Sequence, residues 1–229
     1  MIELHMSPTP NGLKITLFLL EAEIRHRIVQ LRLGEGDQFK PEFLAISPNN
    51  KIPAIVDDEP AGGGAPISLF ESGAILLYLA EKYRRFIPQD TRGRMDVLQW
   101  LFWQMSSLGP MAGQIGHFNV HAPEKVPYAI ARYTKEASRL YRVLNTRLAD
   151  REFIGGSYSI ADMACYPWIV PHRAQGQDLD EYPHIKRWFA AIAARPATRR
   201  AYNGVEDVYA NHPLTDKARA VLFGGARQG

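Results

Sequence analysis

Residues 50–83 decide the fold of this chain and read NKIPAIVDDEPAGGGAPISLFESGAILLYLAEKY. Two short apolar runs, residues 52–56 and 67–70, are separated by acidic residues, prolines and three consecutive glycines. Turn residues that bound two apolar runs predict a β-hairpin, since glycine takes positive φ without steric cost. The longer apolar run that follows, up to Tyr83, predicts a helix, so the stretch forms a ββα unit.

Two features of this stretch predict a binding site. Glu71 and Ser72 lie in the first helical turn, where backbone N–H groups are unpaired and the helix dipole stabilises an anion. Only a peptide bond before proline adopts the cis form with appreciable frequency, and a cis Ile52–Pro53 bond would turn the backbone of Ile52 outward as an open edge. A helix start that binds a carboxylate beside such an edge suits a modified amino acid or a short peptide. Alternatively, Glu71 and Ser72 only cap the helix.

The composition is that of an ordinary globular protein. Its 229 residues are 46% hydrophobic, enough to build the cores of one large or two ordinary domains. The net charge of +3 comes from 27 basic and 24 acidic residues, too narrow an excess to favour nucleic acid. The one cysteine, Cys165, excludes an internal disulfide and a cysteine-cluster metal site. Because the apolar run 15–20 is too short for a signal or a membrane span, we expect a cytoplasmic protein without nucleic-acid or membrane partners.

The chain before the hairpin predicts a β-α-β unit. An apolar run at residues 2–6 predicts a strand, and the turn formers that follow place a helix start near Asn11 or Gly12. Partial alternation over residues 27–33 predicts a second strand, and residues 41–46 predict a short helix that begins with proline. A β-α-β half followed by a ββα half predicts a mixed four-stranded sheet with helices on both faces, which is a thioredoxin-like α/β domain over residues 1–84.

Beyond a linker at residues 85–90 the pattern becomes helical, and residues 91–229 predict an all-α domain with a polar tail. Pro110 is expected to kink or end the first long helix. Ser159 and Asp162 have the spacing of a capping box, and another helix is expected from about residue 182 to 195. The polar tail after Gly204 is expected to lie loosely over the surface.

These features together resemble the glutathione transferase superfamily. Its thioredoxin-like domain carries a cis-proline before the third strand and a Glu/Gln-Ser pair at the start of the third helix. Ile52–Pro53 and Glu71–Ser72 match these two motifs in this chain. Its helical domain carries the Ser-x-x-Asp signature seen at Ser159 and Asp162. The resemblance spans nearly the whole chain. It implies glutathione as the cosubstrate and a cytosolic homodimer.

The sulfur of glutathione must be ionised to act as a nucleophile. Lowering a thiol pKa by about two units requires about 2.7 kcal/mol. One or two hydrogen bonds to the charged sulfur, worth about 1.5–3 kcal/mol each, would suffice. The first loop has no tyrosine and no cysteine, but Ser7, Thr9 and Asn11 are present as donors.

The loop SPTPNG (residues 7–12), with NNKIP (residues 49–53), resembles the Nu class of the superfamily, which comprises bacterial disulfide-bond oxidoreductases. This resemblance implies that Thr9 and Asn11 face the sulfur. It also implies glutathione contacts from Gln38, Lys51, the backbone of Ile52 next to Pro53, Glu71, Ser72 and Arg132. Gln38 and Lys51 would hold the glycyl end, and Arg132 a carboxylate of a second glutathione. Two alternatives stay open: Ser7 contacts the sulfur instead, and Arg132 is an ordinary surface arginine.

We therefore predict a glutathione-dependent disulfide-bond oxidoreductase that reduces small disulfides with two glutathiones and no protein cysteine. The same site is compatible with weak transferase or peroxidase activity. The alternatives are a conventional transferase that conjugates glutathione to an electrophile and a non-catalytic binding module. His117 and His121 lack a third ligand nearby, so we expect no metal. His117, Phe118 and Trp168 are expected to line the cleft between the domains, and Cys165 to be a buried core residue.

Overall fold

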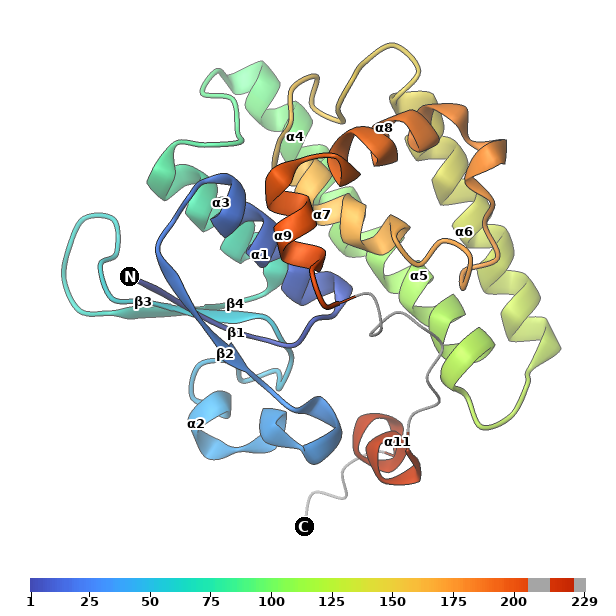
Figure 1. Cartoon of the computed structure of the whole chain (residues 1–229), viewed down its shortest axis with the longest axis horizontal. Coiled ribbons are helices and arrows are strands. Elements are labelled where there is room, and N and C mark those ends of the chain that lie inside the picture. The colour runs from blue at the N-terminus through green and yellow to red at the C-terminus, as the bar shows by residue number, and fades with distance from the viewer. Residues whose placement is uncertain (206–214, 225–229) are drawn as a thin grey trace.

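A computed structural model describes residues 1–205 and 215–224 (Figure 1). The described residues form one mixed sheet in the order β2-β1-β3-β4, in which β1 and β2 are parallel and the other neighbours antiparallel. Its strands are β1 (Ile2–Met6), β2 (His26–Gln30), β3 (Ala54–Asp57) and β4 (Ile67–Phe70). The hairpin and the β-α-β unit are as predicted. The strand expected over residues 27–33 ends earlier, because its partner β1 ends at Met6, which pairs with Gln30.

Helices cover both faces of the sheet (Figure 1). One face carries α1 (Pro10–Glu21) and α3 (Ser72–Tyr83), which pack against each other. The other face carries α2 (Pro41–Leu44), whose Phe43 is buried, with the 3₁₀ turns η1 (Leu33–Glu35) and η2 (Asp37–Phe39) ahead of it. This arrangement confirms the predicted thioredoxin-like domain.

The start of α1 is determined by the loop before it. Thr9 is the N-cap, and its hydroxyl accepts a hydrogen bond from the Gly12 N–H at 3.4 Å, while Pro10 occupies the first helical position. The helix therefore starts one or two residues earlier than predicted. A Cβ atom at Gly12 would lie 2.3 Å from the carbonyl oxygen of Ser7, so glycine is required where the loop folds back on the helix.

The rest of the described chain is helical, which confirms the predicted second domain. Its helices are α4 (Thr91–Trp103), α5 (Gly109–Gly116), α6 (Pro127–Arg147), α7 (Ile160–Ile169), α8 (Pro183–Ala193), α9 (Pro196–Tyr202) and α11 (Asp216–Phe223), with η5 (Leu179–Glu181) as a 3₁₀ turn. Almost every residue of α7 is buried, and this helix packs against α1, α3 and α4. The predicted capping box forms at its start between Ser159 and Asp162. No helix among residues 1–205 and 215–224 is both long and apolar enough to span a membrane.

Pro110 does not end the first long helix of this domain. Helical structure continues from Thr91 to His121 through the π-turns η3 (Gln104–Leu108) and η4 (His117–His121). Because Pro110 has no N–H, an ordinary α-helical bond is missing at this point. The wider bond from the Gly109 N–H to the Gln104 carbonyl forms a π-turn that carries the helix past the proline.

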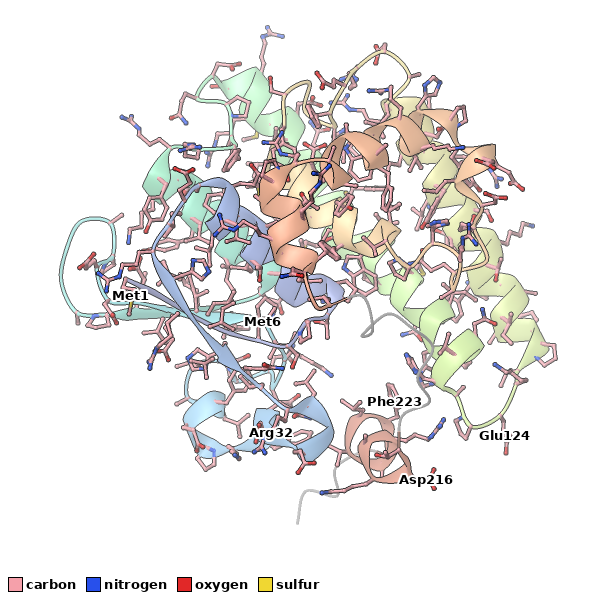
Figure 2. The ribbon with its side chains drawn as sticks, viewed as in Figure 1. Met1, Met6, Arg32, Glu124, Asp216 and Phe223 are labelled. Atoms are coloured by element: carbon pink, nitrogen blue, oxygen red, sulfur yellow. The ribbon has the colours of Figure 1, made fainter. Side chains whose placement is uncertain are left out.

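The prediction of a loose tail is wrong for the part that the structure describes. In α11, the Arg219 guanidinium donates to the carbonyl oxygen of His121, and the Phe223 ring lies 4.8 Å from the ring of His117. On its other side, α11 packs against η1 (Figure 2). The helix thus connects the thioredoxin-like domain to η4, because apolar and hydrogen-bonding partners are available on both sides. Residues 206–214 and 225–229 lie outside the described residues.

Candidate functional site

The register of the sheet brings most of the predicted residues to one edge. His5 of β1 pairs with Ala54 of β3, which in turn pairs with Phe70 of β4. The chain just beyond these three residues therefore lies at the same edge. That chain is the loop that leads into α1, the Ile52–Pro53 bond and the start of α3, and Met6 marks the point where β1 reaches the edge (Figure 2).

The backbone at Ile52 is open. The Ile52–Pro53 bond is cis, as predicted. Neither the N–H nor the C=O of Ile52 forms a hydrogen bond with another described residue. Because an unpaired strand edge can pair with an extended peptide, this segment can hold a short peptide through its main chain.

The start of α3 is also open. Glu71 precedes the helix with φ 69° and ψ 112°, and its exposed side chain forms no capping hydrogen bond. Such a backbone conformation costs a non-glycine residue on the order of 1–3 kcal/mol and is typical of ligand sites. The first helical bond runs from the Ile75 N–H to the Glu71 carbonyl, so the N–H groups before Ile75 have no partner within the helix. The alternative that Glu71 caps this helix is therefore not realised.

Asn11 is oriented by a residue of the other domain. Its side-chain oxygen accepts a hydrogen bond from the indole N–H of Trp168 on α7 at 3.0 Å. An indole N–H can only donate, so the amide oxygen must face Trp168. The NH₂ group of Asn11 makes no hydrogen bond with another described residue, so two N–H donors stay available to a negatively charged atom. The Thr9 hydroxyl lies 3.5 Å from the carbonyl oxygen of Ser7. A hydrogen bond of this length is weak, so the hydroxyl can rotate toward another acceptor.

Ser7 lies beneath the loop. Its side chain is buried, and its hydroxyl donates a short hydrogen bond to the carbonyl oxygen of Leu31. The hydroxyl proton is therefore occupied within the protein. This geometry favours Thr9 and Asn11 over Ser7 as donors to a ligand.

Gln38 and Lys51 differ in exposure. Gln38 is 5% exposed, and its side-chain oxygen has no hydrogen-bond partner among the described residues. Buried polar atoms are rarely left unpaired, so this oxygen suits a donor such as a peptide N–H. Lys51 is exposed, and the Ser47 hydroxyl holds its carbonyl oxygen at 2.8 Å.

Arg132 is exposed on α6 and lines a groove of about 800 Å³ between α5 and α6, together with Met111 and Tyr128. It forms no hydrogen bond or ion pair with the other predicted site residues of the described chain. Its role toward a second ligand stays a prediction.

The remaining sequence predictions concern the helical domain. His117 and His121 both contact the ring of Phe223, and Phe118 stacks on Tyr133 with ring centroids 5.6 Å apart. No group of three or more histidine, cysteine or acidic side chains suited to a metal occurs in residues 1–205 and 215–224.

Cys165 is fully buried on α7. Burial raises the pKa of its thiol well above the ordinary value. A buried thiol of this kind is a core residue and a poor nucleophile, as the sequence predicts.

Sequence reasoning missed two partners of this site. One is Trp168 as the hydrogen-bond donor to Asn11, for which the sequence contains no local signal. The other is Lys14, which is 1% exposed and bonds to the hydroxyl of Ser72 at 3.2 Å. A lone charged residue in segment 13–20, which apart from Thr16 is otherwise apolar, was the available signal for the second.

Family models agree with this architecture. The model described as glutathione S-transferase, N-terminal domain, matches residues 9–82, and the model for the C-terminal domain matches residues 110–196. Together they cover the start of α1, the hairpin, α3 and most of the helical domain.

Two curated relatives come from Escherichia coli (strain K12). The disulfide-bond oxidoreductase YfcG is 59% identical over 202 residues, which are 88% of this chain and 94% of the relative. The disulfide-bond oxidoreductase YghU is 41% identical over 213 residues, which are 87% of this chain and 73% of the relative.

Solved structures with glutathione are also similar. A glutathione transferase family member from Pseudomonas fluorescens, with two glutathione bound, is 42% identical with a TM-score of 0.83, over 87% of this chain and 91% of that one. A glutathione transferase from Pseudomonas putida, with one glutathione disulfide bound per subunit, is 40% identical with a TM-score of 0.83, over 87% and 90% of the two chains.

Proposed function

Because the chain belongs to the glutathione S-transferase family, we propose that it is a glutathione-dependent disulfide-bond oxidoreductase that reduces small disulfides with two molecules of glutathione. The observation that carries the proposal is the Asn11 amide. Trp168 holds its oxygen, so its N–H groups are available at the edge where the peptide-binding backbone of Ile52 is open. The one cysteine of the chain is fully buried, so the reacting sulfur has to come from the ligand.

The reaction proceeds by two thiolate attacks. The thiolate of the first glutathione attacks one sulfur of the disulfide, which forms a mixed disulfide and releases the first thiolate product. The thiolate of the second glutathione then attacks the glutathione sulfur of the mixed disulfide. Glutathione disulfide forms, the second thiolate product leaves, and the two protons lost from glutathione balance the two product thiols.

Each candidate residue has a physical role in this scheme. Asn11 and Thr9 donate hydrogen bonds to the thiolate, which lowers the thiol pKa of bound glutathione. The backbone of Ile52, held beside Pro53, pairs with the cysteinyl unit. Glu71 binds the ammonium group of the γ-glutamyl unit, and Ser72 binds its carboxylate at the positive end of α3.

The other candidate residues bind the remaining parts of the ligands. Gln38 and Lys51 hold the glycyl end of the first glutathione through an amide and a charge. Arg132 holds a carboxylate of the second glutathione, from its exposed place on α6. We further propose that the protein is a cytoplasmic homodimer. The two domains of each chain span residues 1–84 and 91–229.

Two activity assays test the proposal. The protein should reduce hydroxyethyl disulfide with glutathione, followed through NADPH and glutathione reductase, and should conjugate chlorodinitrobenzene far more slowly. Strong conjugation with negligible disulfide reduction would instead identify a conventional transferase. Failure to bind glutathione resin would identify a non-catalytic module.

A Cys165→Ala variant is the matched control for the source of sulfur. It should keep full disulfide reduction, since the buried thiol takes no part in the reaction. Loss of activity in a variant that keeps its circular dichroism spectrum and its melting temperature would contradict the proposal.

A further inference from the structure

Lys14 is a buried lysine at the junction of the two domains. It lies on α1 and is 1% exposed. Its ammonium group lies 2.6 Å from the side-chain oxygen of Gln104, 3.2 Å from the hydroxyl of Ser72 and 3.7 Å from the sulfur of Met105. Lys14 thus connects the start of α3 to the π-turn η3 of the helical domain.

None of these partners is negatively charged. No carboxylate of residues 1–205 or 215–224 lies within ion-pair distance of Lys14. A buried cation without a counter-ion is costly, because its hydration is lost and no opposite charge replaces it. Burial accordingly lowers the pKa of Lys14 to about 7.

The elements packed on α1 bring few charges to Lys14. Cys165, on α7, and Glu71, ahead of α3, act on Lys14 and raise its pKa, against the larger effect of burial. Asp162, in the first turn of α7, acts on Cys165. The turn η3 contributes neutral groups at this point.

The remaining helix on α1 is α9, and its nearest ion pair lies at the other end of α1. There Arg195, which precedes α9, holds Glu21 with a nitrogen–oxygen distance of 2.6 Å. The charge of Lys14 therefore has no ion-pair partner within residues 1–205 and 215–224.

We propose, resting on the function proposed above, that Lys14 is a positioning residue for glutathione. Its ammonium group donates a hydrogen bond to the Ser72 oxygen, and the Ser72 hydroxyl in turn donates a hydrogen bond to the γ-glutamyl carboxylate. The negative charge of that carboxylate then serves as the counter-ion of Lys14.

The geometry of the Ser72 hydroxyl supports this role. A hydroxyl has one donor and two acceptor positions, and an ammonium group can only donate. Lys14 therefore uses an acceptor position of Ser72 and leaves its proton free to donate. Within the described residues, the competing acceptor is the sulfur of Met105 at 3.6 Å, which is weak. A carboxylate at the start of α3 would win this competition.

The helical domain contributes through Gln104. This residue is fully buried and begins the π-turn η3, which is the irregular turn ahead of Pro110. π-Turns inside long helices often occur at functional sites. Here the turn directs the Gln104 oxygen to Lys14, so both domains contribute to the support beneath Ser72.

A measurable consequence is proton uptake on binding. A carboxylate placed close to a partly deprotonated lysine favours its charged form, so binding raises the proton occupancy of Lys14. Isothermal titration calorimetry of S-methylglutathione at pH 7.5, in buffers of different ionisation enthalpy, measures this uptake. This ligand has no thiol to titrate.

Three proteins are compared: the native chain, Lys14→Met and Lys82→Met. Lys82 is a matched control because it lies at the opposite end of α3 and bonds to Asp57. The native chain and Lys82→Met should take up roughly half a proton or more per ligand bound. Lys14→Met should take up none beyond the ligand's own contribution, and should bind about tenfold more weakly, the loss of about one charge-assisted interaction.

Thermal denaturation separates this role from a structural one. Since Lys14→Met removes an uncompensated buried charge, its melting temperature should equal or exceed that of the native chain. Lys14→Gln provides a second uncharged variant, and failure of both to fold would make Lys14 structural and overturn the proposal. Equal affinity and equal proton uptake in Lys14→Met would also overturn it, while the proposed function would stand. If the native chain does not bind S-methylglutathione, the proposed function itself fails.

Discussion

The starts of α3 and α7 contain the same kinds of residue but differ in whether their polar groups find hydrogen-bond partners within the chain. Each has a serine at its start, Ser72 as the first residue of α3 and Ser159 as the N-cap of α7, and a carboxylate nearby, Glu71 at α3 and Asp162 at α7. At α7 the carboxylate accepts hydrogen bonds from the backbone and so caps the helix start. At α3 the carboxylate points to solvent and the helix start stays open.

The start of α7 is satisfied internally. Asp162 is fully buried and accepts hydrogen bonds from the N–H groups of Ile154 and Ser159, each at 2.9 Å, and from the indole of Trp188 at 2.8 Å. Burial raises the pKa of Asp162 to about 6, while these donors act in the opposite direction. A buried carboxylate whose hydrogen bonds are all made within the chain stabilises one structure and has no free acceptor position for a ligand.

The start of α3 carries the opposite features. Glu71 has a strained backbone and no capping bond, and Lys14 lies beneath Ser72 with no ion-pair partner among the described residues. Strain and uncompensated charge both cost folding free energy, and an anionic ligand would lower the cost of the charge. The comparison teaches that the chain itself completes the start of α7, which is structural, and leaves the start of α3 incomplete, where we propose that the ligand binds.

The largest expected effect is on stability and concerns Asp162 at the start of α7. Asp162→Ala should lower the free energy of unfolding by about 3–5 kcal/mol, because it leaves buried N–H donors without an acceptor. The matched variant at the open start, Glu71→Ala, should lower it by less than about 1 kcal/mol. Urea denaturation followed by circular dichroism measures both. Similar losses at the two positions would remove the distinction between the helix starts.

The next effect tests whether the open edge is catalytic. Asn11→Ala should reduce the turnover of hydroxyethyl disulfide about 10²-fold, which is typical of removing a donor to a developing or resident negative charge. Trp168→Phe keeps the packing but removes the N–H that orients Asn11, so we expect a smaller loss of about tenfold. Both variants should fold normally. If Asn11→Ala abolished soluble expression instead, Asn11 would be a structural residue.

A smaller effect follows from the pKa of Lys14. In the folded chain this pKa is about 7, against an ordinary value of 10.5 for lysine, so the unfolded state binds more protons between these pH values and stability rises with pH. From pH 6 to 8, the free energy of unfolding should rise by about 1.4 kcal/mol in the native chain relative to Lys14→Met. Urea denaturation at both pH values measures the difference. Lys82→Met should keep the rise, and parallel curves for the native chain and Lys14→Met would show that Lys14 stays charged throughout.

The smallest effect concerns Ser7. Ser7→Ala should leave disulfide reduction within about twofold of the native rate, because the hydroxyl proton is already bonded to the Leu31 carbonyl. The free energy of unfolding should fall by about 1 kcal/mol, the contribution of one hydrogen bond. A large loss of turnover at unchanged stability would assign the sulfur contact to Ser7.

The sequence by itself determined the features that depend on neighbouring residues. The hairpin, the cis Ile52–Pro53 bond and the capping box of Ser159 with Asp162 all rest on residues a few positions apart. Their spacing has a direct steric or hydrogen-bonding meaning, so these elements could be predicted. The same local signals left open whether Pro110 kinks or ends the helix, because a π-turn there is one of several ways to accommodate a proline.

Only the tertiary structure decided how the site is supported. Trp168 orients Asn11 across 157 residues of sequence, and Gln104 meets Lys14 across 90 residues. The contacts of α11 with η1 and η4 are equally remote in sequence. Contacts of this kind depend on how the two domains pack, and no periodicity or motif encodes that packing. The sequence could therefore predict which side chains lie together at this end of the sheet, but not which buried groups orient them.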